Sequence, residues 1–419
     1  MNTNALLLAG SVLLSLAACQ ADAPTAPVAA NASGEYGAQV WPLPAEAGAM
    51  SPDLSIAPDG RVLLSWINRQ QGRRKALQFA TYSLAGGWQS QPRTVAVGEA
   101  LVANWADTPH MLGTPDGALW VQWLQGGKGV PSAYDTVLAR SRDGGQSWTQ
   151  LTQVNDDTGA AEHGFAALWA DGADALGIAW LDGRWQAGPH AKGEHGPGMM
   201  QLRANRFDLD LARGADAVVD ASVCDCCQVD VAVASTGPLL AYRDRTEAEI
   251  RDIAVVRLQG GAWSTPKIVH ADNWKIAGCP VNGPAIAAGK AGVVVGWYTE
   301  GGGQPTVQLA LSTSGGDSFG APVVVEQGAT VLGRIDVALD ATQAWVSWLR
   351  EVDGAQTLML ARYTPDLSRQ LQRVEVAKLT ARGRASGMPK LAVDAGGAWL
   401  VWTDVIDGVP QLRGAHVTR

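Results

Sequence analysis

Seven short apolar segments along the chain each close on an aromatic residue, and this repetition constrains the fold more than any other feature. Consecutive aromatic positions lie 51 to 62 residues apart. Such a period is typical of proteins in which a small sheet is the repeating unit and stacked neighbours build the core. The pattern therefore predicts a β-propeller, with the aromatic positions at Trp66, Trp123, Trp180, Tyr242, Trp297, Trp348 and Trp402.

Each repeat has room for four short strands separated by turn-forming Gly, Pro and Asp. The last repeat has room for only three, whereas residues 38–43 form a strand with no repeat of its own. Pairing this strand into the last blade would close the ring and leave no open sheet edge. We therefore expect an all-β chain with a single propeller over residues 37–419. Seven four-stranded blades are expected, with six as the alternative.

Composition agrees with one large β domain and limits the partners. The chain of 419 residues contains 17 Trp and 49 Gly and carries a net charge of −8. It has no run of Lys or Arg, so nucleic acid is excluded as a natural partner, and so is an electrostatic membrane patch. We expect a monomer.

The N-terminal segment has the pattern of an export signal. Residues 5–18 are apolar but too short to span a bilayer, and they end in Leu16-Ala17-Ala18-Cys19. This ending resembles the lipobox of bacterial lipoproteins, which implies a signal peptide over residues 1–18 and lipidation of Cys19. An ordinary cleaved signal peptide is the alternative. Residues 19–36 are then a flexible tether, and the protein is expected in the cell envelope, at the periplasmic face or outer membrane, held only by its lipid.

The remaining cysteines are the sharpest chemical signal. Cys224, Cys226 and Cys227 precede the first strand of the fourth blade, and Cys279 precedes that of the fifth. Equivalent places on adjacent blades are neighbours, so the four sulfurs should meet near the channel mouth. Three interpretations stay open: disulfides that tie the two blades together, a soft-metal site for Cu(I) or Zn(II), and a redox-active pair.

Other polar residues should gather at the same mouth, because the second strand of a blade returns to the end where the first began. Their grouping there indicates a ligand site. Taken singly, such residues are more often turn caps and surface ion pairs. The candidates for ligand binding are His110, His163, Asp244 and Asn282.

One turn carries a resemblance to a known superfamily. The segment from Ser141 through Asp143 and Gly145 to Trp148 resembles the Asp box of sialidase and BNR-repeat propellers. In that family the Asp and Ser side chains fix a turn between the third and fourth strands, away from the active site. The resemblance implies the fold rather than a reaction.

The same resemblance implies what a sialidase site would need here. The family clamps a sialic carboxylate with three arginines and uses a Tyr–Glu pair as nucleophile and an Asp as acid/base. A different sequence, Trp41-Pro42-Leu43-Pro44, stands where the family presents its first arginine. The candidate catalytic residues are Arg243, Arg245, Arg334, Asp182, Tyr298 and Glu300.

Together these patterns predict an exported ligand-binding or metal- and thiol-handling module that acts through a cysteine-rich channel mouth. An exo-sialidase-like glycoside hydrolase is one alternative. A protein-interaction scaffold of the cell envelope is another. The expected ligand is accordingly a small molecule, a glycan or an envelope protein, and Cu or Zn is the expected cofactor if the cysteines bind metal.

Overall fold

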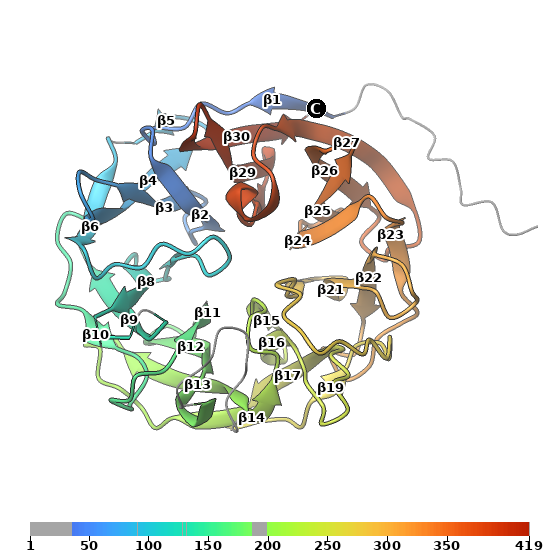
Figure 1. Cartoon of the computed structure of the whole chain (residues 1–419), viewed down its shortest axis with the longest axis horizontal. Helices are drawn as coiled ribbons and strands as arrows, with labels where there is room; N and C mark the ends of the chain where they lie inside the picture. Colours follow the sequence, from blue (N-terminus) through green and yellow to red (C-terminus); the bar gives the residue numbers. More distant parts are fainter. Residues whose placement is uncertain (1–35, 90, 128, 131, 187–198, 419) are drawn as a thin grey trace, which may run out of the picture. The chain divides into compact units, whose positions relative to one another are not determined.

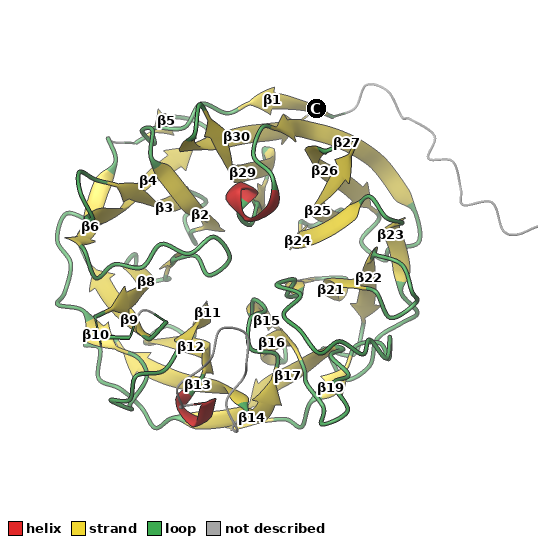
Figure 2. Cartoon of the chain, viewed as in Figure 1, coloured by secondary structure: helices red, strands yellow, loops and turns green. Residues whose placement is uncertain are grey.

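A computed structural model describes residues 36–418, apart from residues 90, 128, 131 and 187–198. The predicted signal peptide, Cys19 and nearly all of the predicted tether lie outside the described residues. The described chain forms seven antiparallel sheets arranged in a ring around a central axis (Figures 1 and 2). The prediction of seven blades rather than six is confirmed. No helix in the described ranges is long and apolar enough to cross a membrane.

The first four blades follow one another along the chain. Blade 1 contains β2 (Ala49–Ile56), β3 (Val62–Arg69), β4 (Lys75–Ser83), β5 (Gly87–Trp88) and β6 (Arg93–Gly98). Blade 2 contains β7 (His110–Gly113), β8 (Leu119–Gly126), β9 (Tyr134–Ser141) and β10 (Thr152–Gln153). Blade 3 contains β11 (His163–Ala170), β12 (Ala175–Asp182), β13 (Met200–Asp208) and β14 (Ala217–Val223). Blade 4 contains β15 (Asp230–Ala234), β16 (Gly237–Arg243), β17 (Ile253–Gln259), β18 (Ala262–Trp263) and β19 (Lys267–Ile268).

The remaining blades complete the ring. Blade 5 contains β20 (Ala285–Gly289), β21 (Gly292–Thr299), β22 (Thr306–Ser312) and β23 (Val323–Gln327). Blade 6 contains β24 (Val331–Leu339), β25 (Ala344–Val352), β26 (Ala355–Tyr363) and β27 (Gln370–Leu379). Blade 7 contains β28 (Lys390–Asp394), β29 (Gly397–Ile406), β30 (Val409–Thr418) and β1 (Gly37–Val40). Two short 3-10 helices lie outside the sheets, at Arg184–Gln186 and Gly383–Ser386.

The aromatic residues that mark the repeat form the core between blades. Trp66, Trp180, Trp297 and Trp348 are fully buried on the second strands of their blades. These strands are apolar on both faces because each blade packs against a neighbour on either side. The repeat in the sequence is therefore the repeat of the packed core.

The ring closes as expected. Strand β1 pairs antiparallel with β30, with Gly37 opposite Thr418 and Val40 opposite Ala415. The N-terminal strand is thus the outer strand of blade 7, beside the C-terminus (Figure 1). The sheet edge that blade 7 would otherwise expose is covered.

The turn between β9 and β10 is built by its own side chains. The hydroxyl of Ser141 donates to Asp143 Oδ1 over 2.8 Å and accepts from the amide of Gly145 over 2.8 Å. Gly145 has a φ of +84°, and a Cβ there would lie 2.2 Å from Phe79 Cζ. Only glycine fits this position, because it both adopts the left-handed backbone and leaves room for the ring.

Substituting Ser141 tests the turn. The side chain is buried, so Ser141→Ala leaves the amide of Gly145 without its acceptor and should lower the unfolding free energy by about 1–2 kcal/mol. Urea denaturation of the purified protein measures this loss. Ser314→Ala, in the exposed turn of blade 5, is the matched control and should cost less. Equal, negligible losses in both variants would contradict a structural role for the Ser141 turn.

Candidate functional site

Two crossover loops carry the four cysteines. Cys224, Cys226 and Cys227 lie between the outer strand β14 of blade 3 and the inner strand β15 of blade 4. Cys279 lies in the loop that leads into β20 of blade 5. The first loop is anchored by the amide of Cys224, which donates to the carbonyl of Arg243 over 2.9 Å. Consecutive inner strands thus bring both loops to one end of the channel.

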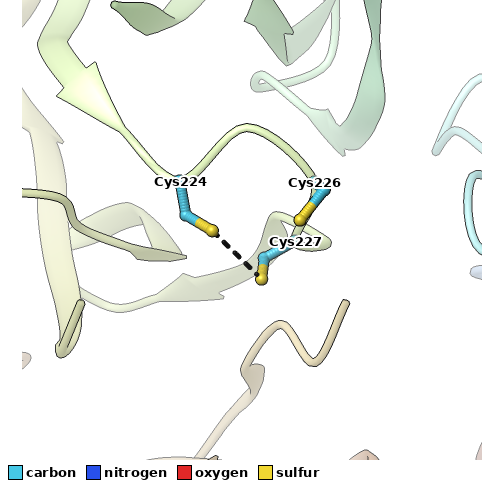
Figure 3. Close-up of side chains that lie close together, drawn as sticks. All are labelled: Cys224, Cys226 and Cys227. Carbon is cyan, nitrogen blue, oxygen red and sulfur yellow. Dashed lines mark hydrogen bonds between the residues drawn. The ribbon is translucent and has the colours of Figure 1, made fainter. Parts of the chain in front are cut away.

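The sulfur atoms converge. The Sγ atoms of Cys224, Cys226 and Cys227 all lie within 4.8 Å of one another, and those of Cys224 and Cys227 are 3.5 Å apart (Figure 3). Cys279 lies beside this group, close enough to Cys226 for each thiol to shift the pKa of the other, which is raised for Cys226 and lowered for Cys279. These four cysteines are free thiols. The structure therefore brings together three thiols of one loop and places Cys279 of the next loop beside Cys226, and we call these four residues the cysteine cluster.

Two arginines supply positive charge to the cluster. Arg251 Nη1 donates to the Sγ of Cys224 over 3.3 Å. Hydrogen bonds from Cys226 and Cys227, together with the charges of Arg243 and Arg251, hold the pKa of Cys224 well below its usual range. Burial raises the pKa of Cys227 to about 12. The two arginines thus favour the thiolate form of Cys224.

Accessibility varies across the cluster. Cys224 and Cys227 are buried, Cys226 is half-buried and Cys279 is exposed. The buried pair packs at the base of the loops, whereas Cys279 faces solvent. Cys226 and Cys279 are therefore the cluster thiols that solvent can reach.

Arg243, one of the candidate clamp arginines, is buried and fully occupied. It donates to the carbonyl of Asn282 over 2.7 and 3.2 Å, to that of Arg251 over 2.7 Å and to that of Tyr298 over 2.8 Å. Its guanidinium also lies 4.8 Å from the ring centre of Trp274. These contacts join the end of strand β16 in blade 4 to the neighbouring loops, so the role of Arg243 is structural.

The other two candidate arginines lie in separate environments. Arg245 pairs with Asp225 over 3.1 Å and with Glu249 over 2.6 Å. Arg334 donates to Ser386 Oγ over 2.6 Å and stacks 5.0 Å above the ring of Trp105. The three arginines therefore do not converge on one free carboxylate-binding point.

Of the remaining sialidase candidates, only the tyrosine and the glutamate meet. Tyr298 Oη donates to Glu300 Oε1 over 2.5 Å, and burial followed by the charge of Glu300 raises the pKa of the phenol. Asp182 lies on blade 3, where its carboxylate binds Arg184 over 2.7 Å. Asp182 is therefore on a different blade from the Tyr298–Glu300 pair, which belongs to blade 5.

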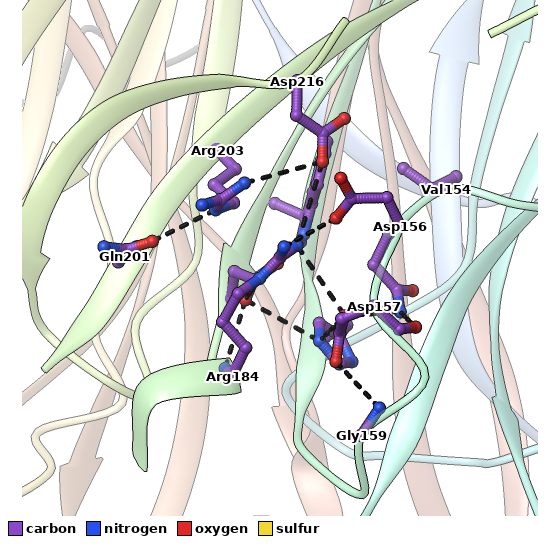
Figure 4. Close-up of polar contacts among 12 residues, drawn as sticks. Val154, Asp156, Asp157, Gly159, Arg184, Gln201, Arg203 and Asp216 are labelled. Carbon is purple, nitrogen blue, oxygen red and sulfur yellow. Dashed lines mark hydrogen bonds and ion pairs between the residues drawn. The ribbon is translucent and has the colours of Figure 1, made fainter. Parts of the chain in front are cut away.

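His163 lies within a buried ionic network rather than at an open mouth. Its Nε2 is 2.8 Å from Asp157 Oδ1 and 3.7 Å from Asp182 Oδ1. Arg184 adds ion pairs to Asp182 and Asp156 (Figure 4). Asp156 and Asp157 follow the last strand of blade 2, whereas His163, Asp182 and Arg184 belong to blade 3, so the network braces blade 2 against blade 3.

The other predicted mouth residues are distributed around the channel. His110 lines the central cavity and contacts Asp53 Oδ1 over 3.1 Å. Asn282 lines a second pocket, and its Oδ1 accepts from the amide of Arg334 over 2.7 Å. Burial raises the pKa of Asp244 to about 6.

Two groups of residues near the channel were not identified from the sequence. One is Arg251, which reaches the cysteine cluster because the hairpin between β16 and β17 folds back over it. The other is a set of charged residues on the inner strands, including Asp230, Asp336 and Lys390. In the structure these residues pair with the position immediately before a repeat aromatic, at Ala241, Ser347 and Val401.

Comparison with known proteins shows the architecture. No protein-family model matches the sequence, and neither does any curated protein sequence. Among solved structures, the phage phi92 endosialidase superposes with a TM-score of 0.50 at 9% identity, over 92% of this chain and 69% of that one. A Dyadobacter fermentans protein of unknown function gives a TM-score of 0.49 at 12% identity, over 89% of this chain and 95% of that one.

An ulvan lyase gives a TM-score of 0.45 at 12% identity, over 78% of each chain. At 9% identity, the likeness to the endosialidase shows a sialidase-like propeller fold and does not extend to an activity.

Proposed function

We propose that the protein is an exported metal-binding module whose cysteine cluster holds a soft metal ion, Cu(I) or Zn(II). The convergence of the three thiols of Cys224, Cys226 and Cys227, with Cys279 beside Cys226, is the observation that carries this proposal. Thiolates are the ligands that select these metals. The anchoring lipid at Cys19 belongs to the same proposal, since it would keep the module at the cell envelope.

The sulfur spacing fits a metal better than a disulfide pair. In a tetrahedral site with Zn–S bonds of about 2.3 Å, neighbouring sulfurs lie about 3.8 Å apart. The Sγ atoms of Cys224 and Cys227 are 3.5 Å apart, and that of Cys226 lies within 4.8 Å of both. A disulfide needs about 2.05 Å between two sulfurs and does not require three to meet.

Arg243 and Arg251 would balance the negative charge of a metal–thiolate centre. Four thiolates around Zn(II) carry an excess of two negative charges, which Arg243 and Arg251 would offset from inside the fold. Cu(I) with three thiolates leaves the same excess. The cluster therefore suits a charged metal–thiolate centre despite its burial.

Metal binding by matched variants tests the proposal. The reduced full chain should bind about one equivalent of Cu(I) or Zn(II), measured by elemental analysis after gel filtration. Cys227→Ser and Cys279→Ser should each weaken binding by at least about tenfold in chelator competition. Cys19→Ser changes the cysteine that is proposed to carry the lipid, which is not one of the four cluster cysteines, and should leave the affinity unchanged.

The disulfide interpretation makes the opposite prediction. Mass spectrometry of the unreduced protein would then link Cys279 to the segment 224–227. If the reduced protein binds neither metal, the proposed function is wrong. Bound metal that survives in both cluster variants would also contradict it.

A glycoside hydrolase is the second candidate, favoured by the contact between Tyr298 and Glu300. A carboxylate beside a phenol can activate it as a nucleophile. Hydrolysis of a fluorogenic sialoside that is abolished by Tyr298→Phe would support this candidate. The full occupancy of Arg243 by backbone carbonyls weighs against a carboxylate clamp that includes it.

A further inference from the structure

The loop after β10 and the strands β11 and β12 bring one imidazole and two carboxylates together. The ligand atoms of Asp157, His163 and Asp182 all lie within 4.8 Å of one another. His163 Nε2 is 2.8 Å from Asp157 Oδ1 and 3.7 Å from Asp182 Oδ1. We call these three residues the histidine site. The histidine site shares no residue with the cysteine cluster or with the lining of the central cavity.

The imidazole of His163 is oriented so that Nε2 faces the two carboxylates. On the other side of the ring, Nδ1 lies 3.1 Å from the carbonyl oxygen of Tyr134. A carbonyl oxygen can only accept a hydrogen bond, so Nδ1 carries the hydrogen. In the neutral ring, Nε2 then holds the lone pair that a metal ion needs. Metal-binding histidines are commonly supported in this way, by donation from the second ring nitrogen to a backbone carbonyl.

The Nε2 atom itself lacks a hydrogen-bond partner. The side chain of His163 is fully buried, and its Nε2 forms no hydrogen bond among the residues that the structure describes. Asp157 Oδ1 is near enough to attract a positive charge but does not meet the ring nitrogen in hydrogen-bonding geometry. A proton on Nε2 would therefore be buried without an acceptor, which costs free energy. A metal ion would instead bond to the nitrogen and to both carboxylates.

The charges around the histidine site leave a place for a cation. Ion pairs link four carboxylates and three guanidinium groups there, those of Asp156, Asp157, Asp182, Asp216, Arg184, Arg203 and Arg213. With a neutral imidazole, this set carries an excess of one negative charge. Arg184 also donates to both oxygens of Asp182 over 2.7 Å, which fixes the carboxylate as an outer-shell partner would (Figure 4).

We propose that the histidine site binds one Mn(II) ion, which ties blade 2 to blade 3. Imidazole nitrogen is a ligand of transition metals, whereas Ca²⁺ and Mg²⁺ take oxygen ligands. Carboxylates and water suit Mn(II), and thiolates select Cu(I) and Zn(II), so the histidine site and the cysteine cluster prefer different ions. The side chain of Asp157 is 18% exposed, so water can complete the coordination shell from its side. The inference does not rest on the proposed cysteine chemistry.

Titration of the chelator-treated full chain with Mn(II) tests the site, with the EPR signal of the free aqueous ion as the readout. One equivalent should bind, and Asp157→Asn should weaken binding by at least about tenfold. Asp210→Asn removes a carboxylate from an exposed turn of blade 3 and is the matched control, which should bind like the parent. Cys279→Ser should also bind like the parent, so failure of the cysteine proposal leaves this inference untouched.

The bound ion also reports on its ligands. Pulsed EPR of bound Mn(II) should show coupling to a directly bonded imidazole nitrogen, and this coupling should disappear in His163→Gln. Mn(II) should raise the melting temperature of the parent but not that of Asp157→Asn, because an ion that binds only the folded state stabilises it. If neither variant folds, the nitrogen coupling in the parent decides.

Three results would overturn the inference. The first is absence of Mn(II) binding by the parent, which would leave a buried imidazolium as the source of the positive charge. The second is equal binding by the parent and by Asp157→Asn. The third is a bound ion that shows no coupling to nitrogen.

Discussion

A chain that lacks residues 36–44 should lose at least about 4 kcal/mol of unfolding free energy. The deletion removes β1, which covers the edge of β30, and it also removes Trp41. Trp41 is 4% exposed, and its ring stacks on Trp88 at 5.0 Å and contacts Trp399 at 4.8 Å. Loss of one buried tryptophan alone costs about 3–5 kcal/mol. Urea denaturation compared with the parent measures the effect.

Two substitutions separate the contributions of the strand and of the ring. Trp41→Ala keeps the backbone pairing of β1 and should reproduce most of the loss. Val40→Ser, at a side chain that is 86% exposed, should change the unfolding free energy by less than about 0.5 kcal/mol. A shortened chain that unfolds at the parental urea concentration would show that the closure does not stabilise the ring.

The closure could be predicted from the sequence because it depends on counting strands. The aromatic residues at the strand ends give the number of blades. Because the last repeat has only three strands, the fourth strand of its blade must come from another part of the chain. The boundaries were less accurate: the predicted strand over residues 38–43 is shorter in the structure, where β1 is Gly37–Val40. The chain after Val40 leaves the sheet because the ring of Trp41 turns into the core between blades 7 and 1.

The inner-strand residues that line the axial cavity, such as Asp336, could not be predicted in the same way, because β-bulges shift the register of the inner strands. The pairing of β2 with β3 shifts between Met50 and Asp53, and that of β24 with β25 shifts between Gly333 and Asp336. An extra residue at a bulge moves every following side chain relative to the start of the strand. The candidates named from the sequence therefore include Arg334, inside the shifted segment, and not Asp336.

The cysteine loops could be placed from the sequence because both precede inner strands of adjacent blades. The contribution of Arg251 could not, since it depends on how a hairpin of blade 4 bends. That hairpin is fixed by an ion pair between Arg251 and Glu249 over 2.7 Å and by the amide of Arg251, which donates to the carbonyl of Trp274 over 2.9 Å. Long-range contacts of this kind have no local sequence pattern.

Replacing Arg243 with methionine should lower the unfolding free energy by about 3–5 kcal/mol. Methionine fills a similar volume but leaves the carbonyls of Asn282, Arg251 and Tyr298 without their donor in a buried site. Each buried carbonyl that loses its partner costs about 1–3 kcal/mol, reduced where the structure relaxes or water enters. Denaturant unfolding measures the loss. Arg243→Lys keeps the charge but not the planar fork of donors, so it should recover only part of the unfolding free energy that Arg243→Met loses.

The Arg243→Met variant also separates the two candidate functions, metal binding and glycoside hydrolysis. Arg243 contributes positive charge to Cys224, so a folded Arg243→Met protein should bind Cu(I) or Zn(II) more weakly than Arg243→Lys. A clamp arginine would behave differently, because its donors would be free for a ligand and its loss would leave stability near the parental value. Arg243→Met with unchanged stability would therefore contradict the structural role assigned to this residue. The contacts of Arg243 with backbone carbonyls predict that Arg243→Met is clearly less stable than the parent, since they hold the base of the cysteine loop against the next blade.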